Sequence, residues 1–323
     1  MNRKNAGAVF GTLCGLTALT AMSAEIFYNF SINTKSPIHM SKLNNLVQKV
    51  TNTSGSEEDA SEKYSGLTGT PEMKKWYNEH GEDVYIMSDS LRLHGKIFKN
   101  NSSKYVIVCH GYTSKAKHMA GFVNKFYSLG YNVLAADARA HGDSEGTKIG
   151  MGWPERFDVI EWIKLIISWE PNAQIILHGV SMGAATVLMS SGEELPENVK
   201  VIIADCGYTS EWDEFKCEAN ALHIPWFPVL NAASVMSRLR DGYDFKQASA
   251  LEKVKQSRIP TLFIHGSDDE LVPYSMLDKL YSAAVCKKEC LTVNGAGHAL
   301  SSSVEPELYW NTVESFIAKY SEK

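Results

Sequence analysis

The sequence Gln174–Met189, QIILHGVSMGAATVLM, is the most informative part of the chain about its fold. Its beginning, up to His178, is short, apolar and β-branched, as expected of a buried parallel strand, whereas the part after Ser181 has apolar residues at helical spacing. The strand therefore turns sharply into a helix within 179–183, a G-x-S-x-G sequence. Side chains two positions before and after the serine would clash with the neighbouring strand and helix, so only glycine fits at both positions.

This turn has two chemical consequences. It presents the Ser181 hydroxyl at the carboxyl end of the sheet, where open α/β folds bind their ligands. It also directs the backbone N–H of Met182 and the positive end of the helix towards whatever the serine attacks. The pentapeptide alone also fits a plain tight connection between a strand and a helix, so its interpretation depends on partners elsewhere in the chain.

Strands and helices alternate on both sides of this stretch. We expect further strands at Val84–Met87, Leu91–Phe98, Lys104–Cys109, Tyr131–Ala136, Lys200–Ala204, Thr261–Ile264 and Leu291–Val293. The first two flank the turn-like Ser88-Asp89-Ser90 and indicate an antiparallel hairpin. The alternation as a whole predicts an α/β fold with a mostly parallel, twisted sheet that is covered by helices on both faces.

One segment interrupts this alternation. More than fifty residues separate the strand that ends at Ala204 from the one that begins at Thr261, too many for an ordinary connection. The middle of the segment is aromatic and contains prolines, as in HIPWFP at 223–228. We therefore expect a helical cap insertion at about 209–257, folded over the end of the sheet that carries Ser181. The alternative is a peripheral pair of helices with its own small hydrophobic contact.

Composition narrows the function classes. A chain of 323 residues with 44% hydrophobic residues can form one large domain, and a net charge of -5 without a Lys/Arg-rich cluster argues against a nucleic-acid partner. The sequence has neither a dinucleotide fingerprint nor a P-loop, and no Cys/His pattern indicates a metal, so we expect no cofactor. Cys286 and Cys290 could be bridged in an oxidising compartment, although their spacing does not require it.

The first seventy residues differ from the rest. Arg3 and Lys4 precede the uncharged stretch 5–24, and aromatic residues cluster at 27–30. This pattern predicts an N-terminal membrane anchor or signal segment over 1–30, with the lipid bilayer as a partner. The Ser-, Thr-, Asn- and Glu-rich region 31–70 is expected to be a polar tether, which leaves 71–323 as the main domain.

Three interpretations of the N-terminal segment remain open. A spanning helix with positive charge only on its leading side predicts a single-pass protein of the cell membrane, with the main domain outside. The small residues around 21–23 also allow cleavage of a signal peptide and secretion. A disordered leader on a cytosolic enzyme is the third.

The serine has candidate partners after the last two predicted strands. His298 lies in the small-residue loop NGAGHA at 294–299, and Asp268 and Asp269 lie in HGSDDELVP at 265–273. Because parallel strands end at the same edge of a sheet, an imidazole and a carboxylate from these loops can meet at Ser181. The chain order is therefore serine, acid, histidine.

With these motifs, the region from about Glu82 to Tyr320 resembles the α/β-hydrolase superfamily. Its G-V-S-M-G elbow, H-G-Y loop, D-x-R-x-H-G-x-S segment and H-G-x-x-D-x-x-V-P segment look like those of bacterial serine esterases and lipases. The leader and the stretch 205–210 are similar to a membrane-anchored subgroup. The resemblance implies that Asp269, rather than Asp268, is the acid, with Asp205 as the runner-up. It also implies that the N–H of Tyr112 joins that of Met182 in an oxyanion hole.

The resemblance implies a serine hydrolase that cleaves carboxylic esters of a small-molecule acyl substrate through an acyl-enzyme on Ser181, with His298 as the base. A peptidase or amidase of the same fold and a non-catalytic binding module are the alternatives. The sequence leaves the acyl and alcohol groups and the oligomeric state open. The polar residues His110, Asp137, Arg139 and His141, at the ends of the third and fourth strands, are expected to hold loops together.

Overall fold

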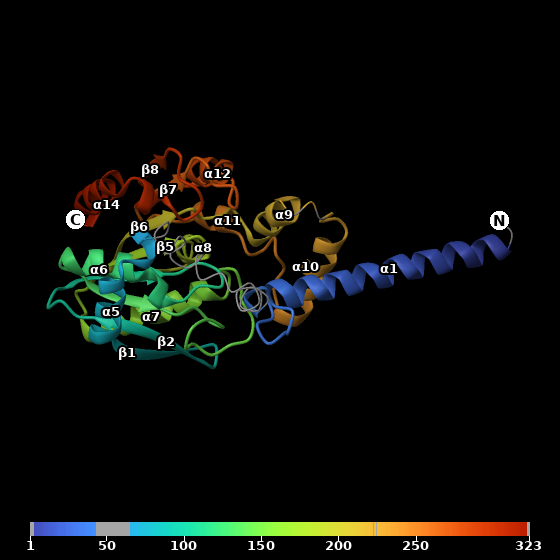
Figure 1. Ribbon diagram of the computed structural model, residues 1–323, viewed down its shortest axis with the longest axis horizontal. Helices are drawn as coiled ribbons and strands as arrows, with labels where there is room; N and C mark the ends of the chain where they lie inside the picture. The colour runs from blue at the N-terminus through green and yellow to red at the C-terminus, as the bar shows by residue number, and fades with distance from the viewer. Residues whose placement is uncertain (1–2, 43–64, 222, 224, 322–323) are drawn as a thin grey trace.

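An eight-stranded sheet forms the centre of the body (Figure 1). The computed structural model describes residues 3–42, 65–221, 223 and 225–321, and for residues 3–16 the backbone alone. The strands are β1 (Glu82–Ser88), β2 (Leu91–Phe98), β3 (Lys104–Cys109), β4 (Asn132–Ala136), β5 (Gln174–Val180), β6 (Val199–Asp205), β7 (Thr261–Gly266) and β8 (Lys288–Val293).

The sheet has the order β1-β2-β4-β3-β5-β6-β7-β8. β1 and β2 form an antiparallel hairpin, β2 pairs antiparallel with β4, and all other pairs are parallel. The predicted α/β fold with a mostly parallel sheet is confirmed. Because β3 to β8 run in one direction, their carboxyl ends form a common edge on which loop residues distant in sequence can meet.

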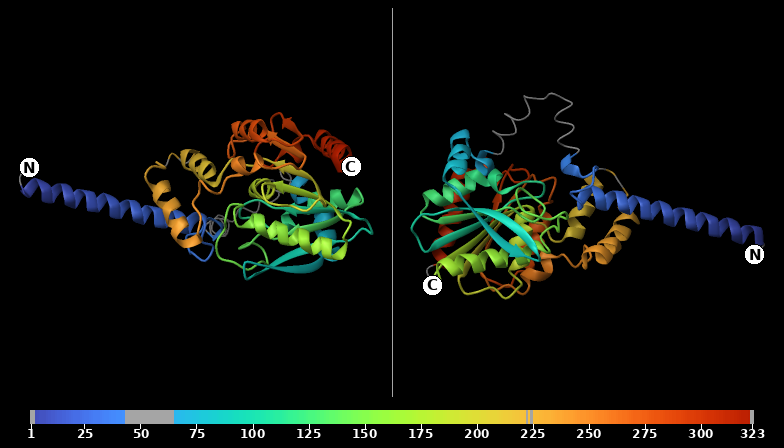
Figure 2. Two further views of the ribbon diagram at one scale, coloured as in Figure 1. Left: turned by 180° about the vertical axis from the view of Figure 1, so that it is seen from behind. Right: turned by 90° about the horizontal axis from the view of Figure 1, so that it is seen from below.

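Helices cover both faces of the sheet (Figure 2). On one face lie α5 (Pro71–His80), α6 (Ala120–Ser128) and α14 (Pro306–Ser321), and on the other α7 (Glu155–Trp169), α8 (Met182–Ser190) and α12 (Ser275–Ala283). Successive strand residues face opposite sides: Val106 and Val108 of β3 pack in one core, and Ile107 between them packs in the other. Short helices complete the body: α4 (Ser65–Thr68), η1 (Ala116–Met119), α11 (Ala250–Val254) and α13 (Ser301–Val304).

The segment between β6 and β7 is helical, as predicted. It contains α9 (Glu211–Ala221) and α10 (Val229–Asp241), after which α11 returns to the body and packs against α8. Phe215 of α9 packs edge-on against Phe245, with ring centroids 5.1 Å apart. These two helices are called the cap below.

The N-terminal helix α1 (Arg3–Ser31) projects from the body in Figure 1, and its C-terminal half packs along α10. Arg240 of α10 donates two hydrogen bonds to the carboxylate of Glu25, at 3.0 and 2.7 Å, and the Tyr28 hydroxyl donates to Asp241 at 2.8 Å. The prediction of a membrane-spanning segment in 1–30 is not supported, since no helix among the described residues combines the length and the apolar character needed to cross a bilayer.

The described parts of the expected tether lie against the body. Ser31 and His39 are buried, Asn33 forms an isolated β-bridge with Lys148, and the N–H of Gly66 donates to Ser303 Oγ at 3.1 Å. Residues 43–64 of the expected tether lie outside the described residues. Cys286 and Cys290, whose pairing the sequence left open, are free thiols.

Candidate active site

Ser181 occupies a sharp turn between β5 and α8. Its φ of 57° is positive, a conformation that costs a non-glycine residue roughly 1–3 kcal/mol. A Cβ at Gly179 would lie 2.2 Å from the carbonyl oxygen of Gly183, and a Cβ at Gly183 would lie 2.1 Å from that of Cys109. Both glycines are therefore required by close backbone packing, as the sequence predicted, and the turn holds Ser181 at the carboxyl edge of the sheet.

Three side chains from separate loops meet at this edge. His298, in the loop between β8 and α13, has Nε2 at 2.9 Å from Ser181 Oγ and Nδ1 at 2.9 Å from Asp269 Oδ2. Asp269 follows β7. The structure thus brings together the three residues that the sequence singled out, in the hydrogen-bonding order hydroxyl, imidazole, carboxylate.

The carboxylate of Asp269 is fully enclosed, with a side chain that is 0% exposed. Its Oδ1 accepts hydrogen bonds from the N–H groups of Leu271 and Val272, at 3.0 and 2.9 Å. Burial alone would raise the pKa of Asp269, but contacts with His265 and His298 outweigh burial and hold the pKa below its usual range. Asp269 therefore stays ionised beside the imidazole.

The two other candidate acids lie in different surroundings. Asp268 is exposed and accepts a hydrogen bond from Ser267 Oγ at 2.7 Å. Asp205 is buried, accepts a hydrogen bond from Ser301 Oγ at 3.3 Å, and has its pKa raised by burial to about 6. Within the described part of the chain neither carboxylate is hydrogen bonded to His298.

Two backbone segments flank the Ser181 hydroxyl. Met182 is the first residue of α8, so its N–H has no acceptor within the helix. On the other side, a Cβ on Gly111 would lie 3.4 Å from Ser181 Cβ, which brings the following residue, Tyr112, beside the serine. The Tyr112 hydroxyl donates to the carbonyl oxygen of Ser31 at 2.7 Å and fixes this loop to the end of α1.

The polar residues after β3 and β4 tie loops together. Arg139 donates to both oxygens of Asp158, at 2.8 and 2.6 Å. The N–H of Ala138 donates to His110 Nε2 at 3.0 Å, and the N–H of Thr113 donates to His141 Nε2 at 3.1 Å. The carboxylate of Asp137 accepts a hydrogen bond from the N–H of Ala116 at 2.7 Å and contacts His94 Nδ1 at 2.7 Å. These contacts fix the shape of the edge around Ser181.

Two groups of side chains among the described residues have the spacing of metal ligands. One is Cys206 together with Asp269 and His298, but burial raises the pKa of the Cys206 thiol well above its usual value and keeps it protonated, so it is a poor ligand. The other contains His94, whose Nδ1 and Nε2 already contact Asp137 and Asp83 at 2.7 and 3.0 Å. His94 and Asp137 therefore already have protein partners for their polar atoms.

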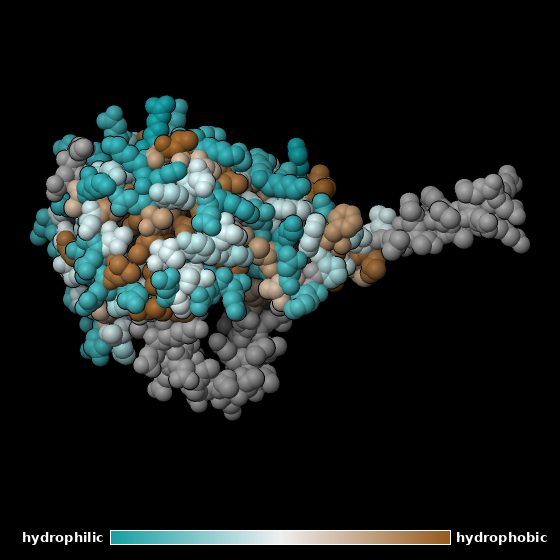
Figure 3. All heavy atoms as spheres, turned by 90° about the horizontal axis from the view of Figure 1, so that it is seen from above, coloured by the Kyte–Doolittle hydropathy of each residue, from teal (hydrophilic) through white to brown (hydrophobic). Residues whose placement is uncertain are grey.

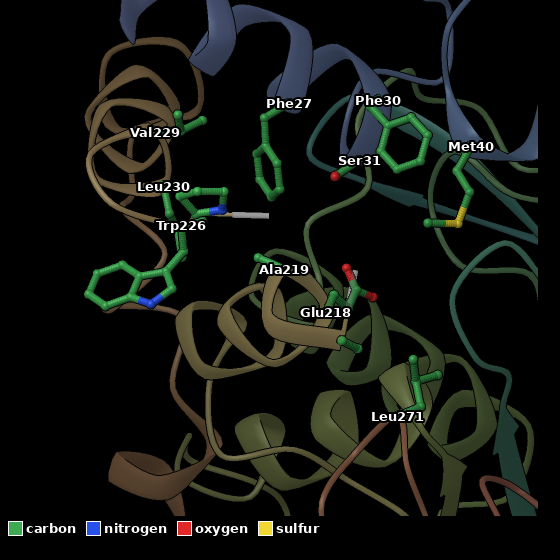
Figure 4. Close-up of a pocket in the computed structure, with 12 residues that line it drawn as sticks. Phe27, Phe30, Ser31, Met40, Glu218, Ala219, Trp226, Val229, Leu230 and Leu271 are labelled. Carbon is green, nitrogen blue, oxygen red and sulfur yellow. The ribbon is translucent and has the colours of Figure 1, made fainter. Parts of the chain in front are cut away.

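A cavity of about 290 Å³ lies between α1 and the cap (Figure 4). Phe27 and Phe30 of α1 line one side, and Val229 and Leu230 of α10 line another. Sequence reasoning missed this contribution of the N-terminal segment. The available signal was the aromatic cluster at 27–30, which the sequence pattern assigned to a membrane anchor or signal segment.

Comparisons with known proteins give a consistent family. Residues 100–249 match the family described as Serine aminopeptidase, S33. The chain is 30% identical over 214 residues to the uncharacterized protein YqkD of Bacillus subtilis, covering 66% of this chain and 70% of that protein. It is 28% identical over 212 residues to lysophosphatidylserine lipase ABHD12 of Macaca fascicularis, covering 65% of this chain and 50% of the lipase.

Solved structures agree with these relatives. The esterase Pf2001 of Pyrococcus furiosus is similar, with a TM-score of 0.63 and 26% identity over 76% of this chain and 95% of that chain. The family match at 100–249 includes Tyr112 and Ser181 and ends before Asp269 and His298.

Proposed function

The chain belongs to the α/β-hydrolase superfamily, and from this premise we propose that it hydrolyses carboxylic esters through an acyl-enzyme on Ser181. The observation that carries the proposal is the unbroken contact from Ser181 Oγ through His298 to Asp269, with both distances at 2.9 Å. A hydroxyl is a weak nucleophile unless an adjacent base removes its proton, and an imidazole at this distance can do so.

The proposed reaction has two halves. His298 Nε2 takes the proton of Ser181, Oγ attacks the acyl carbonyl, and the alcohol leaves with the proton that His298 returns to it. Water then gives a proton to His298 and attacks the acyl-enzyme, which releases the acid and restores the serine. In both halves the N–H groups of Met182 and Tyr112 donate to the carbonyl oxygen as it becomes negative. Asp269 orients the imidazole and stabilises its charged form.

An ester is preferred over an amide as the substrate because of the surroundings of the site. The neighbouring cavity is lined almost entirely by apolar side chains, and Glu218 is its one charged lining residue among those described. Relatives named as an esterase and a lipase support the same choice. The family description as a serine aminopeptidase keeps amide hydrolysis as the second candidate, and the triad chemistry serves both bonds.

The test uses the full chain and its Ser181→Ala variant. Purified protein should hydrolyse p-nitrophenyl acetate and butyrate and should be labelled by a fluorophosphonate, and the variant should lose both properties. A parallel assay with aminoacyl p-nitroanilides compares amide cleavage. Labelling of a residue other than Ser181, or ester hydrolysis that survives in Ser181→Ala, would refute the proposal, and faster anilide than ester cleavage would favour the amidase.

We further propose that α1 brings the enzyme to a lipid surface. Leu19, Met22 and Ile26 recur at helical spacing on one side of α1 and are 56%, 58% and 54% exposed. In Figure 3 hydrophobic side chains appear at the surface where the projecting helix meets the body. Sedimentation with phosphatidylcholine vesicles should be lost when the three residues are changed to Glu, and unchanged binding would rule the proposal out.

We propose a location at the cell membrane, with the body outside, together with this lipid-binding surface of α1; secretion is the alternative. An enzyme held at the cell membrane with its body outside is labelled on intact cells by a membrane-impermeant fluorophosphonate and sediments with the membranes. A secreted enzyme is labelled in the medium instead. Labelling only after the cells are broken would contradict both placements.

A further inference from the structure

The cavity between α1 and the cap is enclosed by parts of the chain that are far apart in sequence. In Figure 4 Phe27 and Phe30 descend from α1, Trp226, Val229 and Leu230 approach from the cap, and Leu271 lies at the far end. The position of α1 is fixed from outside the cavity by the bonds of Glu25 and Tyr28 to α10. The N-terminal segment is therefore a wall of the cavity.

Three contacts connect this cavity with the triad. The N–H of Leu271 donates to the carboxylate of Asp269 at 3.0 Å. Ser31, another lining residue, accepts the hydrogen bond of the Tyr112 hydroxyl at 2.7 Å. Burial raises the pKa of the Glu218 carboxyl to about 7, the charge of the His298 imidazole opposes this rise, and in Figure 4 this carboxyl points into the space below α1. The cavity is thus connected to the triad through its lining residues Leu271 and Ser31.

Size and polarity define the group that the cavity accepts. Its volume of about 290 Å³ is close to the lower limit of small-molecule sites. At about 30 Å³ per group of the size of a water or methylene, this volume holds roughly ten methylene groups. An unbranched hydrocarbon chain fits such a lining, because each methylene leaves water without requiring a hydrogen-bond partner.

The order of the two half-reactions indicates whether the acyl group or the alcohol group of the ester binds in the cavity. The alcohol must leave after the first half, and the His298 side chain, which passes it the proton, is 19% exposed. The acyl group stays bound to Ser181 through both halves, so a fixed apolar cavity suits it better.

From these observations we propose that the cavity binds a medium-length fatty acyl chain, of about six to ten carbons, and that Phe27 and Phe30 of the N-terminal segment set its length. The inference rests on the proposed ester hydrolysis and names its substrate class. It makes α1 a specificity-determining part of the enzyme, in addition to its proposed contact with lipid.

The test is the chain-length profile of p-nitrophenyl esters from acetate to dodecanoate on the full chain. For the unmodified enzyme kcat/KM should rise up to about fourfold per methylene, which corresponds to about 0.8 kcal/mol, and stop rising at eight to ten carbons. Ala219→Trp fills the cavity and should move the optimum down by several carbons. Phe30→Ala enlarges it and should move the optimum up.

Matched controls lie on the outer side of the cap. Val235 and Leu239 of α10 are 58% and 82% exposed, so Val235→Trp and Leu239→Ala should keep the original profile. Circular dichroism spectra and melting temperatures that match those of the unmodified protein show that each variant is folded. The same profile in all variants would overturn the inference, as would a length dependence found only in the alcohol of alkyl acetates.

A second measurement separates this inference from the proposed function. In Ser181→Ala, octan-1-ol should change the emission of Trp226, which lines the cavity, whereas butan-1-ol should act only at much higher concentration. Trp226→Phe should remove this signal. Octanol binding without any ester hydrolysis would refute the proposed function and keep the cavity assignment, and hydrolysis without octanol binding would do the reverse.

Discussion

At the scale of single residues, the candidate site shows how environment separates two identical side chains. Asp268 and Asp269 are neighbours in sequence, yet one carboxylate is exposed and the other is enclosed and held by two backbone N–H groups. Only the enclosed one contacts His298. The family resemblance selected Asp269 over Asp268 and Asp205, and the turn after β7 provides the physical difference between the two neighbours.

This difference gives the first prediction. Asp269→Asn removes the charge that orients and stabilises the imidazole, and kcat for p-nitrophenyl butyrate should fall by about 10⁴-fold, as for the acid of other serine triads. Asp268→Asn, one position away, should stay within a few fold of the unmodified enzyme. Activity assays on the two variants, whose circular dichroism spectra must match, measure the ratio of their kcat values. An equal loss of kcat in both variants would contradict the assignment of Asp269.

Glu218 gives a prediction about pH. Burial raises the pKa of this carboxyl to about 7, so it is mostly neutral below pH 7 and ionised above it. Ionisation places a charge in an apolar cavity, and KM for p-nitrophenyl octanoate should increase severalfold from pH 6 to pH 8. Glu218→Gln should remove this increase. The control substrate is p-nitrophenyl acetate, whose acyl group is too short to fill the cavity. The pH dependence of its KM should be the same in the unmodified enzyme and in Glu218→Gln.

At the scale of elements, the turn between β5 and α8 depends on glycine packing. A Cβ at Gly183 would overlap the backbone of β3, 2.1 Å from the Cys109 oxygen, and backbone cannot move aside as a flexible side chain can. We expect Gly183→Ala to lower the melting temperature of the protein and to abolish its labelling by a fluorophosphonate. Gly130→Ala is the matched control, because φ there is 87° but no atom lies within 4 Å, so only about 1 kcal/mol of backbone strain is expected.

The elements also show what sequence patterns could and could not predict. The alternation of strands and helices and the turn at Ser181 follow from local periodicity, and the long interval before Thr261 was sufficient to predict an insertion there, which contains helices. The docking of α1 on α10 could not be predicted in this way. Glu25 and Arg240 are 215 positions apart, and an apolar aromatic helix has the same local pattern whether it packs on lipid or on protein.

At the scale of the whole molecule, two buried acids lie between the cap and the body. Glu211 and Glu214 are 0% and 3% exposed, and neither oxygen of Glu211 nor Oε2 of Glu214 has a hydrogen-bond partner among the described residues. Burial raises the pKa of both carboxyls well above the usual value. The folded protein therefore keeps protons on these groups under conditions where the unfolded chain has released them.

This proton difference sets the sign of the last prediction. Above the ordinary pKa of about 4.5 the unfolded state binds fewer protons than the folded state, so these two groups lower the free energy of unfolding as pH rises. Buried histidines with lowered pKa values, such as His141 and His178, have the opposite effect, but only below about pH 6.5. Glu218, whose pKa burial raises to about 7, also titrates between pH 6.5 and 8, so the effect of Glu211 and Glu214 is measured as the difference between a variant and the unmodified protein.

Glu211→Gln and Glu214→Gln should each become more stable relative to the unmodified protein as pH increases across this range. The gain is at most about 1.4 kcal/mol per pH unit for each carboxyl that stays protonated in the folded state. Urea unfolding at several pH values measures it, with Glu307→Gln on the exposed first turn of α14 as the control. If the difference in the free energy of unfolding between variant and unmodified protein does not change with pH, the cap does not hold these carboxyls in their neutral form. The contact between cap and body would then be open enough for water to reach them.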